Sequence, residues 1–513
     1  MPNTIAFNAM PADQRTSLFF AEFNAGVPPY SGTSRQLVIG HKTSSGTVPL
    51  GLLTPLGGTD PNILFGPGST LADQAQFARR HDPVGEIYCL AIAEPGGGAA
   101  DVRTVTFTGP ATAGGQYVRY IAGEQVSIPV SAGDSATQVA TRFAAAVNAG
   151  YVRFDRRMYF PVVAMSAAGV VTLTSRHVGT VGNQVRIESG LNGDEIDPAG
   201  LTTTVANPTP GTGDVDLATA LAYVNTSPAD WVTDAFAATT TRLDVVKSYL
   251  SNTGTGRWAP TVQKQGHFTT ALSGSLSTLV TFGAARNDPH VSVFGANNFP
   301  HPLWCISAAL NGVIARSKNL AASISEAVEI SRPLRSLALE GIRPPKVDTD
   351  RFNDADRNSL YRNGIAGYTT DRDGTVRIER VVTTYQTNAV GAADTTFLDV
   401  ETLAQSVYIG RYLRQRIEST YPRHALREDN PLGLQGVVTA EGALNTGRHA
   451  YRELCDGGIC EKPELVNRFM KCERSADPNR LNFFLPADVT NQLRVFAANI
   501  TIYNEFDQNR QAA

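Results

Sequence analysis

The chain has 513 residues, which is too many for a single hydrophobic core, and this length predicts roughly three domains. Its 44 lysine and arginine residues against 47 aspartate and glutamate residues give a net charge of −3, a balance that disfavours nucleic-acid binding. Charged residues form only 18% of the chain, whereas glycine (46) and proline (29) are plentiful. Such a composition suits a protein whose surface is covered by neighbours, and it suits a β-rich enzyme as well.

Residues 1–25 are expected to form an extended N-terminal arm. Ile5 and Phe7 alternate along the chain, and Leu18 and Phe20 belong to a second strand-like run, but prolines interrupt the segment. The arm is too short to bury a core, so it is expected to pack on its own domain or on a neighbour. The first 25 residues lack the pattern of a signal peptide, and no stretch approaches 18 apolar residues, so membrane insertion is not predicted.

Residues 26–95 and 215–345 alternate between short apolar strands and helices. The predicted strands are 37–39, 86–93, 231–236, 261–269 and 291–294, and the predicted helices are 70–81, 216–224, 239–250, 274–285 and 303–319. Ser69 is the expected N-cap of the first helix. This spacing predicts a discontinuous α/β domain with a mostly parallel sheet covered on both faces.

Residues 96–214 interrupt the alternation, beginning at three glycines and ending in a linker at 207–213. Alternating segments at 102–108, 117–121, 125–130, 162–164, 170–174 and 184–188 predict strands, and 136–148 predicts one helix. We therefore expect a small β-rich domain inserted into a loop of the α/β domain, since flexible ends allow such an insertion.

Residues 346–490 are expected to form an α+β C-terminal domain. Asp373-Gly374 predicts a hairpin turn, and Asn353 or Asp354 should cap a helix that ends at Arg362. A long helix should start near Asp394–Thr396 and end before Pro422. Its apolar stripe comprises Val400, Leu403, Val407, Gly410, Leu413, Ile417 and Tyr421. A helix at 442–455 and strands at 467–474 and 481–485 should follow.

Three arginines, Arg411, Arg414 and Arg416, lie off this stripe in the second half of the long helix. They predict a basic face that binds an acidic partner, or a solvated helix face with Glu418 nearby.

Residues 491–513 are expected to form a C-terminal arm with apolar residues on both faces of a strand at 493–503. The relevant residues are Leu493, Val495 and Ala497 on one face, and Arg494, Phe496, Ala498, Ile500 and Ile502 on the other. An unpaired edge of this kind invites other chains. The strand should therefore lie in its own sheet or complete the sheet of a neighbour.

The candidate catalytic and ligand-binding motifs each lack residues or spacing that they require, so no catalytic, cofactor-binding or metal-binding residue is predicted. His267, His290 and His301 with Asp288 suggest a metal or acid–base site, but nothing in their spacing makes them converge. The turn at 66–69 lacks a P-loop lysine, and the acidic run at 348–358 lacks the glycine and closing glutamate of a calcium loop. The cysteines are odd in number and scattered, and they are expected to be reduced: Cys89, Cys305, Cys455, Cys460 and Cys472.

Short motifs recur in a fixed order along nearly the whole chain. They are residues 5–8 with 10–12 and Arg15, Trp258-Ala259-Pro260, Gln265-Gly266-His267, Arg286-Asn287 with His290, 376–386 with Asp394, Asp399-Val400-Glu401-Thr402, Tyr421-Pro422-Arg423, and Asp477-Pro478-Asn479-Arg480-Leu481. Taken together, they resemble the tail sheath proteins of Mu-type contractile bacteriophages.

This resemblance implies a structural virion protein that polymerises helically around an inner tail tube and contracts to drive the tube through the host envelope, which allows genome ejection and host cell entry. The implied partners are copies of the chain, the tube protein, and the baseplate and tail terminator proteins, with assembly in the host cytoplasm. The terminal arms would join subunits, and the innermost C-terminal domain would turn its arginines toward the tube.

An α/β hydrolase-like enzyme with an inserted lid domain is the alternative. Alternating strands and helices with an insertion are a common enzyme plan, and the region around His267 and His290 would then hold the active site. The two classes differ in size, because a sheath forms very large tubes and an enzyme forms a small closed particle.

Overall fold

The computed structural model describes residues 33–502, which divide into two compact units. The large unit contains residues 34–320, 329–408 and 489–502, and the small unit contains 321–328 and 409–488 with Thr33. The division falls within one helix, α10 (Val400–Thr420). The mixed α/β, multidomain class predicted from the sequence is confirmed.

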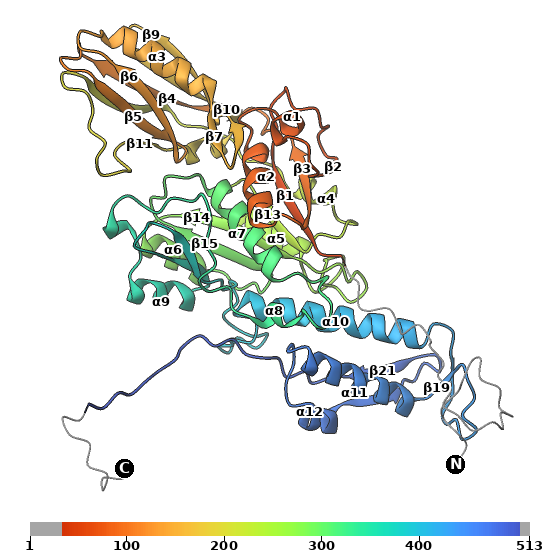
Figure 1. Ribbon diagram of the computed structural model, residues 1–513. Coiled ribbons are helices and arrows are strands. Elements are labelled where there is room, and N and C mark those ends of the chain that lie inside the picture. Colours follow the sequence, from red (N-terminus) through yellow and green to blue (C-terminus); the bar gives the residue numbers. More distant parts are fainter. Residues whose placement is uncertain (1–32, 503–513) are drawn as a thin grey trace, which may run out of the picture. The chain divides into compact units, whose positions relative to one another are not determined.

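The large unit is built on an eight-stranded sheet in the order β17-β16-β15-β14-β13-β1-β3-β2 (Figure 1). Its strands are β1 (Arg35–His41), β2 (Leu53–Pro55), β3 (Glu86–Ile92), β13 (Trp231–Asp234), β14 (His267–Ser273), β15 (Val291–Ala296), β16 (Ile365–Thr370) and β17 (Val376–Arg380). All pairs are parallel except the two at the edges, β2 with β3 and β16 with β17. Every residue of β13 and β15 is buried, so both faces of the sheet are covered, as the apolar runs predict.

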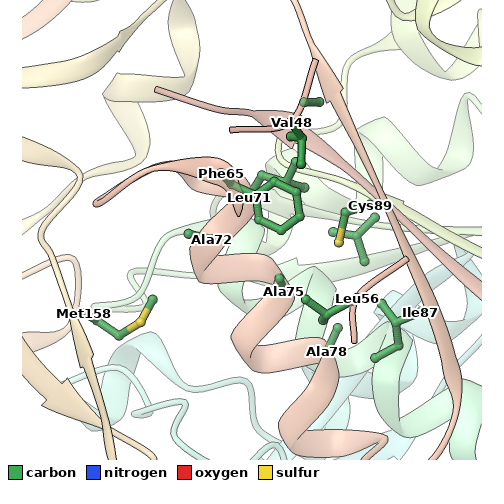
Figure 2. Close-up of a cluster of buried hydrophobic side chains, with 12 residues drawn as sticks. Val48, Leu56, Phe65, Leu71, Ala72, Ala75, Ala78, Ile87, Cys89 and Met158 are labelled. Carbon is green, nitrogen blue, oxygen red and sulfur yellow. The ribbon is translucent and has the colours of Figure 1, made fainter. Parts of the chain in front are cut away.

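Helices cover this sheet where their apolar faces meet it. They are α1 (Pro61–Phe65), α2 (Thr70–His81), α4 (Leu217–Ala222), α5 (Thr240–Tyr249), α6 (Leu276–Ala284), α7 (Leu303–Ser317) and α9 (Asp354–Arg362), with α8 (Val328–Ser331) at the boundary between the units and a 3₁₀ turn at Asp348–Asp350. Ser69 caps α2 as predicted, accepting a 3.1 Å hydrogen bond from the Ala72 amide. Figure 2 shows Leu71, Ala75 and Ala78 along α2 in the buried apolar cluster beside β3.

The β-rich segment folds into two larger sheets, one helix and the two-stranded hairpin β7–β8. The strands are β4 (Ala100–Thr108), β5 (Gly115–Ile121), β6 (Glu124–Val130), β7 (Tyr151–Arg153), β8 (Arg156–Met158), β9 (Val162–Ala167), β10 (Val170–Val178), β11 (Ile187–Glu188) and β12 (Thr202–Thr209), with helix α3 (Ala136–Ala149) and a 3₁₀ turn at Thr180–Gln184. The sheets have the orders β12-β4-β10-β9 and β11-β5-β6. The ends of the segment meet, because Ala99 and Thr212 exchange two backbone hydrogen bonds of 3.0 Å.

Some elements differ from the predictions. The linker expected at 207–213 begins inside β12, an edge strand, where Pro208 removes no hydrogen bond that the sheet needs. The strand expected at 261–269 starts only at His267, because the buried Arg257 guanidinium donates to backbone carbonyls, including Ser227 and Gln265 at 2.9 Å, and holds the preceding residues as a loop. The sheet domain was expected to end at 345, yet β16 and β17 continue the sheet to Arg380.

The helix α10 begins later than expected and ends as predicted. Asp394 makes a local turn with the Thr396 amide (2.9 Å) instead of capping the helix, which starts at Val400 and stops at Thr420 before Pro422. Helix α9 has the predicted cap at Asn353, reinforced by a capping box with Asp356.

The small unit contains the second half of α10 together with α11 (Ala440–Asp456) and α12 (Pro463–Phe469). Its two-stranded pairs are β18 (Ala425–Leu426) with β19 (Val437–Val438) and β20 (Lys471–Arg474) with β21 (Leu481–Phe484). The strand predicted at 467–474 is wrong in its first half, because Pro463 occupies the first turn of α12 and the helix runs to Phe469.

Candidate assembly surfaces

The C-terminal residues 489–494 are held on the large unit by side chains of α10 and by Arg335. The Gln405 amide donates to the Thr490 carbonyl (2.8 Å), and Arg335 donates to the Arg494 carbonyl (3.4 Å). The Arg494 guanidinium lies 3.0 Å from Glu401 and 3.1 Å from Asp399. The arm therefore has a defined root on its own subunit.

The apolar side chains of the arm are exposed from Leu493 onward. Leu493 is 71% exposed, Val495 79%, Phe496 84%, Ile500 80% and Ile502 86%, and Ala497 is exposed as well. Within residues 33–502, the strand predicted for this segment has no pairing partner, and residues 495–502 make no hydrogen bond to another described residue. So many large apolar side chains exposed to water on one segment are unusual for an isolated chain. The N-terminal arm residues Ile5, Phe7, Leu18 and Phe20 lie outside the described residues.

The three arginines of α10 fall in the small unit and have different surroundings. Arg416 forms a 2.9 Å ion pair with Glu453 of α11, which also accepts a hydrogen bond from Tyr412 (2.8 Å). Arg414 lies 3.6 Å from Glu418, one turn along the helix, and Arg411 donates to the Thr33 carbonyl (3.3 Å). Arg416 thus has a structural role between α10 and α11, while the Arg414 side chain remains half exposed.

The histidines singled out from the sequence are buried and individually paired. His267 contacts the Ser292 hydroxyl (2.9 Å), and His290 contacts the Asn252 amide oxygen (3.0 Å) and stacks on Trp258. Burial lowers the pKa of each to about 3, so both rings are neutral. Asp288 accepts a hydrogen bond from the His290 amide (2.9 Å).

His301 lies apart from that pair, in a cleft of about 650 Å³ between the inserted domain and the 339–346 segment. Its Nδ1 accepts a hydrogen bond from the Arg343 amide (3.2 Å), and its Nε2 lies 3.7 Å from Glu124. The three histidines therefore do not form one site.

The carboxyl edge of the sheet, where α/β enzymes bind ligands, is filled by the inserted domain. The chain passes from β1 to β3 on one side and later to β13 on the other, and a crevice at such a switch point is the usual ligand site. Here the His41 ring at the end of β1 lies 5.4 Å from the His177 ring of β10, and Gln184 donates to the Ala235 carbonyl (3.0 Å). Burial lowers the pKa of His41 to about 4 and raises that of Asp234, at the end of β13, to about 6. His41 packs against the insertion, and both groups are buried rather than open to a substrate.

The cysteines and acidic residues form no recognisable metal centre. Among the described residues, no three His, Cys, Asp or Glu side chains are grouped to hold a metal ion, and all five cysteines are free. In the same part of the chain, no helix is both long enough and apolar enough to cross a bilayer.

Two comparisons by sequence find similar proteins of one kind. Residues 211–384 match the family model of the phage tail sheath protein central domain. The chain is 29% identical over 505 residues to the Mu-like prophage FluMu tail sheath protein of Haemophilus influenzae, covering 96% of this chain and 98% of that protein.

Two solved structures are also similar to the chain. One is the crystal structure of a sheath tail protein from Desulfitobacterium hafniense, with 12% identity, a TM-score of 0.48, and coverage of 93% of this chain and 97% of that one. The other is the anti-feeding prophage helical sheath in the contracted state, with 10% identity, a TM-score of 0.44, and coverage of 96% and 100%.

Both sequence comparisons thus relate the chain to the tail sheath proteins of phage-type tails. The resemblance to the Mu-like tail sheath proteins, inferred from short motifs, is confirmed by a likeness that extends over nearly the whole chain.

Proposed function

We propose that this protein is the subunit of a contractile tail sheath, which polymerises helically around an inner tail tube and contracts to drive that tube through a host envelope. The observation that carries the proposal is the C-terminal arm, which is anchored on its own subunit up to Arg494 and presents exposed Phe496, Ile500 and Ile502 beyond it. A monomeric protein gains nothing from such a segment, whereas a polymer requires a link of this kind.

The arm supplies the link as an added β-strand in a neighbouring subunit. After Arg494, its backbone donors and acceptors make no hydrogen bond to the described residues, and main-chain hydrogen bonds give strand addition its affinity. Its apolar residues on both faces would be buried between the layers of the neighbour. We propose the same role for Ile5, Phe7, Leu18 and Phe20 of the N-terminal arm.

A link from one patch of a subunit to a different patch of the next does not close, so it generates a helix. The lattice would shorten when subunits rotate into a packing that buries more surface, with the arms keeping neighbours connected. An additional apolar burial of about 1,000 Å² per subunit would supply at most roughly 25 kcal/mol. Summed over many subunits, this drives a tube without nucleotide hydrolysis.

The inner tube is the proposed partner of the basic face on α10, with Arg411 and Arg414 as its contacts. Arg416 is a weaker candidate than the sequence indicated, because Glu453 already neutralises it. In this proposal the inserted domain (96–214) lies outermost, and the inner domain, which includes the second half of α10 but not the sheet strands β16 and β17, turns this face toward the tube. We further propose that the baseplate and tail terminator proteins are partners of the sheath, and that the sheath assembles in the host cytoplasm.

Electron microscopy of the purified chain tests the proposal directly. We expect long helical tubes by negative stain, which become discrete small particles when residues 495–513 are deleted. An untruncated chain that stays as small closed particles under all assembly conditions would contradict the proposal. Tubes that form normally without residues 495–513 would remove the C-terminal arm from it.

A further inference from the structure

A buried carboxylate stands at the start of α10. Glu401 lies in the first turn of this helix, is completely buried, and accepts a 2.9 Å hydrogen bond from the Leu334 amide. The helix N-terminus favours a negative charge, but a charge without contact to water also needs a cation close by.

Lys318, Arg380 and Arg494 all lie near this carboxylate, and of these three Arg494 forms an ion pair with it. The Lys318 ammonium donates to the carbonyls of Glu329 (3.1 Å) and Arg332, and burial lowers the pKa of Lys318 to about 8 although Glu401 lies nearby. The Arg494 guanidinium reaches Glu401 itself at 3.0 Å, and it lies 3.1 Å from Asp399. Asp399 is held in place by two hydrogen bonds from Arg380, of 2.7 and 2.8 Å.

The Arg494 side chain is much less exposed than the residues on either side of it. The Arg494 side chain is only 18% exposed, whereas its neighbours Leu493 and Val495 are 71% and 79% exposed. The hydrogen bonds to the Thr490 and Arg494 carbonyls fall at or before this arginine, and none of the described residues forms a hydrogen bond with 495–502. Arg494 is thus the last point at which the described arm is attached to its own subunit.

We propose that Arg494 is a positioning residue that fixes where the intersubunit arm leaves its subunit, so that the part available to a neighbour begins at Val495. This inference rests on the proposed function, in which the arm joins subunits. In a paired strand, Phe496, Ala498, Ile500 and Ile502 share a face with Arg494, so the anchored side chain also sets which face of the arm meets the neighbour.

Loss of the Arg494–Glu401 contact would lengthen the free part of the arm that joins two subunits. Releasing residues 490–494 adds roughly 15 Å of slack at about 3.3 Å per extended residue. Subunits would remain linked, but at a poorly defined distance and register, so that long regular tubes would become rare.

Spin labels on the arm of dispersed full-length subunits separate anchored from free residues. A nitroxide on N491C reports the root and one on A498C reports the distal arm, each measured in the unchanged chain, in R494Q and in R494K. We expect the label at 491 to be restricted in the unchanged chain and in R494K, and to become as mobile as the label at 498 in R494Q. Negative-stain counts of the same unlabelled proteins should show severalfold fewer long tubes for R494Q, with recovery in R494K.

The outcomes distinguish the inference from the proposed function. A label at 491 that is equally restricted in R494Q overturns the anchor, and a released label with normal tubes overturns its positioning role. If the unchanged chain forms no tubes, the proposed function fails, while the mobility at 491 still decides whether Arg494 anchors the segment. Should R494Q misfold, the neutral pair R494Q/E401Q removes both charges together, and the same mobility comparison applies.

Discussion

Arg153 of the β7–β8 hairpin and Asp73 of α2 form an ion pair of 2.7 Å, and their side chains are only 6% and 3% exposed. Arg153 also lies 3.2 Å from Glu124 and donates to Gln76 (2.6 Å), and its guanidinium is stacked over Phe77. This largely buried cluster links residues of the inserted domain to α2 of the sheet domain within the large unit.

Replacing Arg153 should therefore cost much more than replacing an exposed arginine. R153M leaves Asp73 and Glu124 as buried charges without their partner, and we expect a loss of about 3–5 kcal/mol in the free energy of unfolding. Urea denaturation of dispersed subunits measures it. R80M is the matched control, because the Arg80–Glu340 pair is half exposed, and it should cost about 1 kcal/mol or less. Equal losses for the two variants would show that the joint is not specifically stabilising.

The elements of the α/β region were largely predictable, because each has a strong local signal. Helix α2 begins and ends where Ser69 and the apolar spacing indicate, and α7 follows its apolar run from Leu303. The assignment of β16 and β17 to a separate domain failed for a different reason. Their pairing with β15 joins residues some 70 positions apart, and no local pattern encodes such a long-range choice.

The sequence predicted the apolar residues of the C-terminal arm but not the ion pairs that anchor it. The alternating apolar residues from Leu493 to Ile502 stand out, but Arg494 looked like an ordinary polar position between them. Its partners Asp399 and Glu401 are about 90 residues away, and Lys318 is farther still. The sequence shows Arg494 as a single charge inside an apolar run, and it shows Asp399 and Glu401 as two acids at the start of a helix. Nothing in the sequence indicates that these residues are paired, which becomes apparent only in the fold.

The position at which the arm is truncated should matter. A chain ending at Arg494 keeps the pair with Glu401, so it should fold as stably as the full chain and fail to form tubes. A chain ending at Asn491 lacks the arginine as well and leaves Glu401 buried without its contact, which should cost about 2–5 kcal/mol. Thermal unfolding and negative-stain microscopy of the two truncations measure stability and assembly separately. Identical stabilities would contradict a structural role for Arg494.

Charge reversal on α10 tests the proposed contact with the tube. R411E/R414E should reduce binding to an acidic tube surface and leave tubes of sheath alone intact, since both changes avoid the Arg416–Glu453 pair. Co-sedimentation with purified tube at two salt concentrations measures the effect, which should be larger at low salt. The control R427E/R452E reverses two half-exposed arginines elsewhere in the small unit. Binding that falls equally in both double variants would point to net charge instead of a specific face.

The buried histidines predict how folding stability depends on pH. Burial lowers the pKa of His267 and His290 to about 3, so below their ordinary pKa of 6.5 the unfolded chain binds protons that the folded chain refuses. Their contribution to stability is therefore complete above pH 6.5 and is lost as the pH falls toward 3. Asp234 acts in the opposite direction, because its pKa is raised to about 6 and its ionisation destabilises the fold as the pH rises from 3.8.

Substituting one of these histidines should remove its contribution to the dependence of the free energy of unfolding on pH. Each group contributes about 1.4 kcal/mol per pH unit where only the unfolded chain is protonated. H290Q keeps an amide that can donate to Asn252, so it should fold, and its free energy of unfolding should fall less steeply between pH 6 and pH 4 by roughly that amount. Urea titrations of dispersed subunits at several pH values give the slope, which is independent of any constant cost of the substitution. The exposed His449→Gln serves as the control, and an H290Q slope equal to that of the unchanged chain would mean that His290 is protonated in the folded state.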